Sequence, residues 1–364
     1  MDKVLATKVI DTARFYMSGD NCQPFRYRFN IATQTFHIDY LADKAKHTFV
    51  YDDYTILLTL GSLLEYLETT LKEYSHSCEL TFDFGKFSAY EDKPSICSVA
   101  VHAQSTQTAQ TKDTSLFSVL KQRFTDRRPY NGPETIDISV EHLDQQLTHS
   151  TCKLFTNAAT DTLRFFAGCD SSIWLSKSLG KDIMDAVAFD PKSPTGLPWR
   201  NLGVKKSDAL LIKAIQRHHW LFNVLKHCGA RMLMLHTQKK LWLSSKSFLV
   251  FSYAPGLSKE HKTIACKQMM YTLLSLSKSG YVFQPSTMSA EILNTPFKPI
   301  NIVSSANMQP SKLEQQVQKQ REYLGLDIAE EEVQWVLRIG KVDSPLDNTA
   351  LTNRHLTETL LKFE

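Results

Sequence analysis

The sequence lacks the features that would place it among membrane-spanning, secreted or nucleic-acid-binding proteins. Its longest apolar runs, TILLTLGSLL and SFLVFSYA, are too short to span a bilayer, and MDKVLATKVIDTARF has no signal-peptide core. The seven cysteines are scattered and form no CxxC pair, so reduced thiols fit better than a disulfide framework or a zinc knuckle. The net charge is only +4, and we expect no basic stripe. The expectation is a cytoplasmic protein with no membrane and no nucleic-acid partner.

The sequence also offers no metal-ligand set and no obvious acid–base pair. Four histidines fall between His218 and His236, but adjacent histidines point to different faces of a helix, and no carboxylate or cysteine completes a set. Asp52 and Asp53 could act as an acid–base pair, yet Asp53 fits the N-cap of the following helix better. Cys22 fits a small packed side chain better than a redox thiol. No metal site and no catalytic side chain are predicted.

What the sequence does contain is typical of a globular protein. Of its 364 residues, 42% are hydrophobic and 22% are charged, which suits two domains or one large one. Mixed helical and alternating patterns favour the α/β or α+β class. The patterns predict helices over 3–17, 53–74, 207–228, 261–279, 311–323 and 329–338, and strands at RYRFNI, FHIDYL, CELTFDF, ICSVAVHA, RMLMLHT and SFLVFSYA.

Glycine and proline mark three positions in this pattern. Gly61 lies inside the nearly apolar helix 53–74, where it would let another backbone come close. Gly280 follows the helix 261–279 at the place of a C-cap glycine. Residues 185–205 hold three prolines and two glycines, which predicts a long irregular loop of the kind that forms lids and binding loops.

The stretch FTDRRPYNGP places several cations around a hydroxyl group. Arg123, Thr125, Arg127 and Arg128 could surround a phosphate, because guanidinium groups offer a planar fork of donors and threonine adds a short one. The alternative is a solvated helix end, at which cations complement the helix dipole. Both interpretations stay open on the local sequence.

A second polar stretch, YMSGDNCQPF, follows the first helix. Ser18, Asn21 and Gln23 can each donate and accept hydrogen bonds, and the flanking glycine and proline hold them on a turn. Such a turn could bind the edge of a flat heteroaromatic ring. A helix C-cap followed by an ordinary turn is the alternative.

Together these stretches resemble the motifs of the nitroreductase superfamily of FMN-dependent proteins. YMSGDNCQPF is similar to A-P-S-x-x-N-x-Q-P-W, with Phe25 in place of tryptophan. RFTDRRPY is similar to R-R-[ST]-x-R, with Phe124 in place of the second arginine, for which Arg128 could compensate. VQWVLRIGKVDSPLDNTALTNRHLTETL resembles the closing pattern of the family, an apolar strand and a loop followed by a basic residue, here Arg354. LSLSKSGYVFQP is similar to the segment that faces the flavin ring, near Gly280.

The order of the motifs resembles the Acg-like branch of this superfamily. The N-x-Q-P motif comes first and the arginine motif lies far downstream, which reverses the order of the ordinary nitroreductase. The resemblance implies an α+β fold with two nitroreductase-like lobes in one chain, at residues 1–115 and 116–364, and with antiparallel-rich sheets flanked by helices. The chain would be a pseudo-dimeric monomer, with a further homodimer as an option.

The resemblance implies that FMN lies between the lobes. The arginine–threonine cluster would neutralise its phosphate, Arg354 would close the phosphate site from the other lobe, and the N-terminal turn would reach the ring. The residues implied at the flavin are Ser18, Asn21, Gln23, Arg123, Thr125, Arg127, Gly280 and Arg354.

The implied activity is two-electron transfer from NAD(P)H through flavin to a small electron-poor acceptor, such as a nitro compound or a quinone. Two alternatives stay open. One is a non-catalytic FMN-sequestering or regulatory protein with a lid over the flavin, formed by residues 185–205 or by the helix 311–323. The other is an FMN-dependent dehydrogenase that tailors a peptide-derived product.

Overall fold

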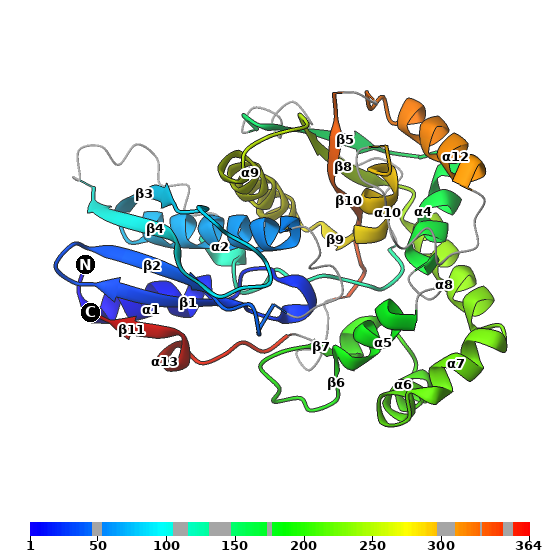
Figure 1. The fold of residues 1–364 in the computed structure, drawn as a ribbon, viewed down its shortest axis with the longest axis horizontal. Helices are drawn as coiled ribbons and strands as arrows, with labels where there is room; N and C mark the ends of the chain where they lie inside the picture. The colour runs from blue at the N-terminus through cyan, green and yellow to red at the C-terminus, as the bar shows by residue number, and fades with distance from the viewer. Residues whose placement is uncertain are drawn as a thin grey trace.

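The computed structural model has an α+β fold in which helices flank antiparallel-rich sheets (Figure 1). The residues that the structure describes are 1–45, 53–104, 116–130, 147–172, 177–296, 310–327, 330–344 and 352–364. Within these ranges, no helix is both long and apolar enough to cross a membrane.

The first sheet has five strands in the order β11-β1-β2-β4-β3, and only the β11–β1 pair is parallel. Buried positions alternate with partly exposed ones along β1 and β2, as the alternating sequence predicts for a sheet with one covered face. Because the C-terminal strand β11 pairs with β1, close to the N-terminal end of the chain, the two chain ends lie close together (Figure 1). The strands are β1 (Phe25–Asn30), β2 (Thr35–Tyr40), β3 (His76–Phe82), β4 (Lys93–Ala103) and β11 (Leu361–Phe363).

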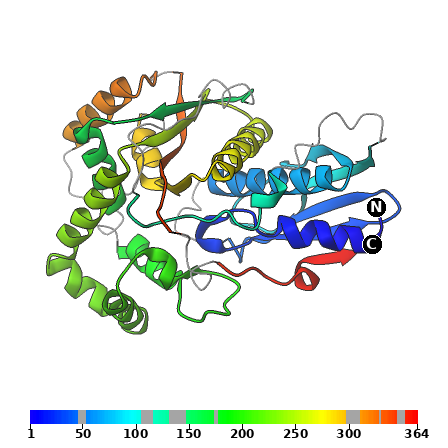
Figure 2. The same cartoon turned by 180° about the vertical axis from the view of Figure 1, so that it is seen from behind.

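The second sheet has four antiparallel strands in the order β5-β8-β10-β9. Every residue of β8 and β10 is buried, because α9 lies on one side of the sheet and α4, α8 and α10 lie on the other (Figures 1 and 2). The strands are β5 (Ser150–Phe155), β8 (Phe248–Tyr253), β9 (Val282–Pro285) and β10 (Glu332–Gly340). The helices are α4 (Thr160–Ser172), α8 (Ala230–Ser245), α9 (Lys259–Lys278) and α10 (Thr287–Leu293), with α12 (Pro310–Tyr323) beside α10.

The two sheets are joined through a pair of packed helices, α2 (Tyr54–Glu73) and α9. Gly61 lies at their contact: a Cβ atom there would lie 2.5 Å from Cys266 Cβ and 2.7 Å from the backbone nitrogen of Lys267. The close backbone approach predicted from this glycine is therefore confirmed. One continuous apolar core includes side chains of both helices and both sheets.

The remaining elements cover the edges of these layers. Helix α1 (Lys3–Ala13) packs on α2, and α13 (Thr357–Leu360) precedes β11. A smaller helical group lies at one edge of the molecule (Figure 1) and has its own apolar cluster. It contains α5 (Lys177–Asp185), α6 (Lys206–Arg217) and α7 (Trp220–His227), with β6 (Val187–Ala188), β7 (Leu197–Pro198) and the 3₁₀ turn η4 (Trp199–Leu202) beside it.

Most predicted elements are confirmed, and four need correction. The helix predicted over 3–17 ends at Ala13, and the helix predicted over 207–228 is two helices separated at His218. RMLMLHT was expected as a strand but lies inside the helix α8. The helix expected over 329–338 is wrong in the described part, where β10 begins at Glu332, and the structure has there the apolar strand that the family resemblance implies. The strand is buried on both faces, which removes the alternation that marks a half-buried strand. The polar stretch AQSTQTAQTKDT at 103–114, whose composition predicts a loop, lies mostly outside the described residues.

The predicted lobes, 1–115 and 116–364, stay a prediction. Four strands of the first sheet come from the first range, and all strands of the second sheet come from the second. The last strand, β11, departs from this division because it pairs with β1.

Candidate functional site

A cavity of about 180 Å³ lies where the two halves of the fold meet. Its walls come from the turn after α1, the first turns of α2, the segment around Arg123, the residues after β9, the start of β10 and the C-terminal segment. Six of the eight residues predicted at the flavin line this cavity, although they are spread over most of the chain. They are Ser18, Asn21, Arg123, Thr125, Arg127 and Arg354.

The cavity has three arginine side chains in its wall. Arg123 Nε donates a 2.9 Å hydrogen bond to the hydroxyl of Tyr66, Arg127 donates to the Asn201 side-chain oxygen, and Arg354 donates to the Asn21 side-chain oxygen. Within the described ranges, none of the three arginines forms an ion pair with a carboxylate. The three positive charges are held by neutral partners, which leaves them available to an anion.

Burial raises the electrostatic cost of these cations. It lowers the pKa of Arg127, and it lowers the pKa of Arg354 to about 10, with a further contribution from the neighbouring charge of Arg123. An anion bound beside Arg123 and Arg354 would offset this repulsion. The cavity is therefore suited electrostatically to a negatively charged ligand.

Two buried polar atoms in the cavity wall have no hydrogen-bond partner among the described residues. One is the donor Nε of Arg354, and the other is the acceptor Oε1 of Gln334, which lies on the fully buried strand β10. A buried polar atom without a partner is costly, so such atoms point to a missing ligand or water. The cavity thus offers a donor and an acceptor in addition to its charges.

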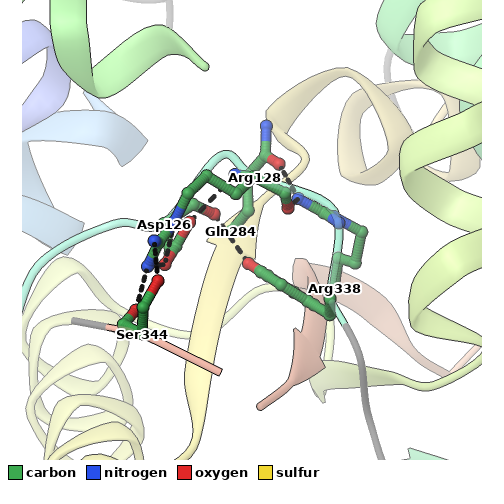
Figure 3. A network of polar contacts seen from close by, with 6 residues as sticks. Asp126, Arg128, Gln284, Arg338 and Ser344 are labelled. Carbon is green, nitrogen blue, oxygen red and sulfur yellow. Dashed lines mark hydrogen bonds and ion pairs between the residues drawn. The ribbon is translucent and has the colours of Figure 1, made fainter. Parts of the chain in front are cut away.

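The segment that carries Arg123 to Arg127 is held against β9. Thr125 forms an isolated bridge with Phe283, and the backbone nitrogen of Asp126 donates to the Phe283 carbonyl at 3.2 Å. Figure 3 shows the polar network behind this segment. Buried Arg338 donates to the Arg128 carbonyl at 2.9 Å and to the Gln284 side chain at 2.6 Å.

Arg128 belongs to this supporting network and does not line the cavity. Its guanidinium group pairs with the buried Asp126 at 2.7 Å and donates to the Ser344 carbonyl at 3.0 Å (Figure 3). The suggestion that Arg128 compensates for Phe124 is therefore wrong, because Asp126 already neutralises the charge of Arg128. Phe124 itself lines the cavity and adds an apolar surface.

The amide side chains of Asn21 and Gln23 are turned towards the loop 185–205. Asn21 Nδ2 donates to the carbonyls of Pro194 at 3.1 Å and Gly196 at 3.3 Å, and Gln23 Nε2 donates to Pro194 at 2.6 Å. Gln23 Oε1 also accepts from the backbone nitrogen of His355. Asn21 still forms part of the cavity wall, but Gln23 is buried behind it.

The turn that carries these amides is strained. Asp20, Asn21 and Gln23 all have φ between 46° and 56°, a left-handed conformation that non-glycine residues adopt at a cost. Ser18 Oγ accepts a hydrogen bond from the Gln23 backbone nitrogen at 3.2 Å, which helps to hold the turn. Such strain persists where surrounding contacts fix the backbone, and it is common at binding sites.

Gly280 does not lie at the cavity. It follows α9 with φ 79°, and the backbone nitrogen of Tyr281 donates to the Leu276 carbonyl at 3.0 Å, so the C-cap prediction is confirmed. The chain reaches the cavity wall only at Pro285, at the end of β9. The ring-facing position implied for Gly280 is not what the structure shows.

Several wall residues were missed by the sequence reasoning. Asp20 lies within the first motif, and burial raises its pKa to about 6, although Arg127 acts in the opposite direction. Tyr54 and Thr55 begin α2, and Glu291 comes from α10. Gln334 carried one available signal, since it is a polar residue inside the apolar run VQWVL.

The two lid candidates differ in their position. Leu197 and Asn201, from the loop 185–205, line the cavity. The helix α12, which contains the other candidate, packs instead through Leu313 and Val317 against the far side of α10. The structure thus places only the loop 185–205 beside the cavity.

No protein-family model matches the chain, and a comparison with curated proteins finds no match. The resemblance to nitroreductases therefore stays a prediction from the motifs quoted above.

Proposed function

We propose that the cavity binds FMN and that the protein is a cytoplasmic oxidoreductase of the nitroreductase type. It would pass two electrons from NAD(P)H to an electron-poor organic acceptor, such as a nitro compound or a quinone. The observation that carries the proposal is the convergence of six motif residues on one cavity, with three arginines that lack carboxylate partners among the described residues. A nitroreductase-like fold of the Acg-like, two-lobed kind is part of the same proposal.

The positive charge of the cavity supports the proposed binding of the FMN phosphate. A phosphate monoester carries between one and two negative charges at neutral pH. Arg123, Arg127 and Arg354 would supply cationic donors, and Thr125 would add a hydroxyl. The unpartnered Nε of Arg354 matches the need for one more donor. These four residues fit the group.

The other residues of the cavity wall support the proposed binding of a flat ring with polar edges. Leu58, Phe124, Val333 and Trp335 offer apolar contacts, and Gln334 Oε1 offers an acceptor without a partner among the described residues. When bound, the flavin itself would supply the hydride-accepting chemistry. The protein would hold the ring, exclude water and complement its charge, so no catalytic side chain is named.

A second candidate, sequestration of FMN without turnover, is favoured by the loop 185–205. Pro194 accepts hydrogen bonds from both Asn21 and Gln23, and the Asn353 side chain donates to the Pro191 carbonyl. These contacts tie the loop to the turn after α1 and to the C-terminal segment, both of which contribute to the cavity wall. A loop held in this way would hinder access of NAD(P)H to a bound flavin.

An absorption spectrum of the purified full chain, with and without added FMN, tests the shared claim. NADPH and then NADH are added under anaerobic conditions. We expect a bound-flavin spectrum that bleaches. A bound flavin that neither nucleotide reduces, although dithionite does, would favour sequestration. No flavin binding would refute both candidates.

A pair of variants tests which residues hold the cofactor. Arg123→Ala combined with Arg127→Ala should yield a folded protein with far less FMN. Lys121→Ala is the matched control, because this nearby lysine pairs with Asp11 at the surface and does not line the cavity. Full flavin occupancy in the double variant would contradict the phosphate assignment.

A further inference from the structure

The positive charge of the chain is concentrated in one short segment. Residues 205–246 contain nine lysines and arginines but a single acidic residue, Asp208, which gives a net charge of +8. The whole chain carries +4, so all other residues together carry −4. The expectation of no basic stripe is therefore corrected: the chain-wide sum conceals a strong local excess.

This segment forms the three consecutive helices α6, α7 and α8. They lie at one edge of the molecule, far from the two termini, in both views (Figures 1 and 2). Helices α6 and α7 rest on a small cluster formed by Ile212, Ile215 and Phe222 with Met184 and Val187, separate from the main core. The helices thus present much of their surface to solvent.

The same helices expose an unusual amount of apolar surface. Seven of the thirteen large hydrophobic side chains that are exposed among the described residues fall between 210 and 243. Six of them, two on each helix, are between 44% and 68% exposed. They are Leu210 and Leu211 on α6, Trp220 and Val224 on α7, and Met232 and Leu233 on α8.

Exposed cations share helix sides with these apolar residues. On α6, Lys213 and Arg217 follow Leu210 at three and seven residues, and all three side chains are exposed. On α8, exposed Lys240 follows Leu233 at seven residues. Each of these helices therefore presents apolar and positively charged groups along one side.

We propose that α6, α7 and α8 dock on an anionic lipid surface, with Trp220 and its apolar neighbours in the interfacial region. Basic helices with exposed Trp and Leu side chains bind such surfaces by combining apolar burial with attraction to acidic headgroups. The sequence-based expectation of no membrane partner rested on apolar runs too short to span a bilayer, and docking on a lipid surface needs no spanning segment.

The charge also separates this occupant from others. Two copies of the chain that met through these helices would bring two segments of charge +8 together, which opposes association. Nucleic acid would match the cations through its phosphates but leave the exposed leucine and methionine side chains in water. A lipid surface complements both properties. This proposal does not depend on the proposed flavin chemistry.

Sedimentation of the full chain with vesicles tests the proposal. One vesicle set contains phosphatidylcholine alone, and the other contains one third phosphatidylglycerol. We expect binding to the anionic set, at least about tenfold tighter than to the neutral set, and weaker in high salt because salt screens the attraction. Equal binding to both sets, or to neither, would overturn the proposal.

Exposed positions supply variants that should not affect folding. Lys213→Glu with Lys240→Glu should weaken binding by more than about twentyfold, since each cation near the surface is worth about fivefold. Lys8→Glu with Lys86→Glu is the charge-matched control on exposed lysines elsewhere. Because both double variants change the net charge of the protein equally, a larger loss of binding in Lys213→Glu with Lys240→Glu would not arise from net charge alone. Equal loss in both pairs would overturn the assignment to these helices.

The apolar contribution is tested at Trp220. Trp220→Glu should reduce vesicle binding, while Tyr90→Glu, at the similarly exposed Tyr90, should not. Vesicles should shift the tryptophan emission of the wild type to shorter wavelength, and Trp220→Phe should bind but lose most of this shift.

Two further results would assign the helices to another occupant and overturn the proposal. One is a concentration-dependent dimer in sedimentation equilibrium that Trp220→Glu dissociates. The other is tight binding to duplex DNA that the Lys213→Glu, Lys240→Glu variant loses, together with indifference to vesicles.

Discussion

The replacement Gly61→Ala tests the packing of α9 against α2, the helix whose first turns line the cavity. The new Cβ would lie 2.5 Å from Cys266 Cβ and 2.7 Å from two backbone atoms, Lys267 N and Thr263 O. Optimal contacts between such atoms are about 3.5–4.0 Å, so relief requires α2 and α9 to separate by about 1 Å. Because two of the three contacts are backbone atoms, a change of rotamer cannot provide it.

The sign of the effect depends on two opposing terms. Alanine in place of glycine inside a helix favours folding by up to about 1 kcal/mol. Overpacking of a close interface costs about 1–3 kcal/mol, and contacts with backbone atoms place Gly61 at the upper end. The free energy of unfolding of Gly61→Ala should therefore be about 2 kcal/mol lower than that of the wild type.

Urea unfolding followed by circular dichroism measures this difference. Gly168→Ala is the matched control, because Gly168 also lies inside a helix, α4, and a Cβ there would meet no atom within 4 Å. Gly168→Ala should be slightly more stable than the wild type. A Gly61→Ala variant as stable as Gly168→Ala would refute the close approach of α2 and α9.

Three other changes test the cavity itself. Arg354→Met should weaken FMN binding on the order of tenfold to a hundredfold by fluorescence titration, since a charge-assisted bond is lost, and unchanged affinity would contradict its role. Asn353→Ala removes the hydrogen bond from the exposed Asn353 side chain to Pro191, which helps to hold the loop 185–205, so FMN should dissociate several-fold faster in stopped-flow experiments. An unchanged dissociation rate would show that this contact does not control ligand release. Burial raises the pKa of Asp20 to about 6, so its carboxyl is neutral below that pH and repels FMN only above it. Asp20→Asn should therefore strengthen binding at pH 8 but not at pH 5, and an equal effect at both would refute this.

Much of the fold could be predicted because local patterns agree with the final structure. Buried and partly exposed residues alternate along the strands β1 and β2. The helix α2 could be predicted from its long apolar run, and its close contact with α9 from the glycine inside that run. Strand β10 could not be recognised from periodicity, because its nine residues are all buried and the alternation disappears.

The candidate site was predictable in residue type but not in detail. Arg123 and Arg127 were identifiable from their spacing, and Arg354 was indicated only by the family resemblance of the C-terminal segment. All three reach one cavity. The hydrogen bonds of Asn21 and Gln23 to Pro194 could not be foreseen, since they join residues far apart in the chain. Arg128 has the same residue type as Arg127, and only the buried Asp126 beside it explains why it turns away.

The most direct test of the central claim is the stoichiometry and affinity of FMN for the isolated chain, measured by isothermal titration calorimetry together with its mass in solution. The account predicts one FMN bound per monomer, because the six motif residues at the cavity can meet within one chain without a second copy. A monomer that binds no FMN, or a chain that gains flavin only on self-association, would contradict it.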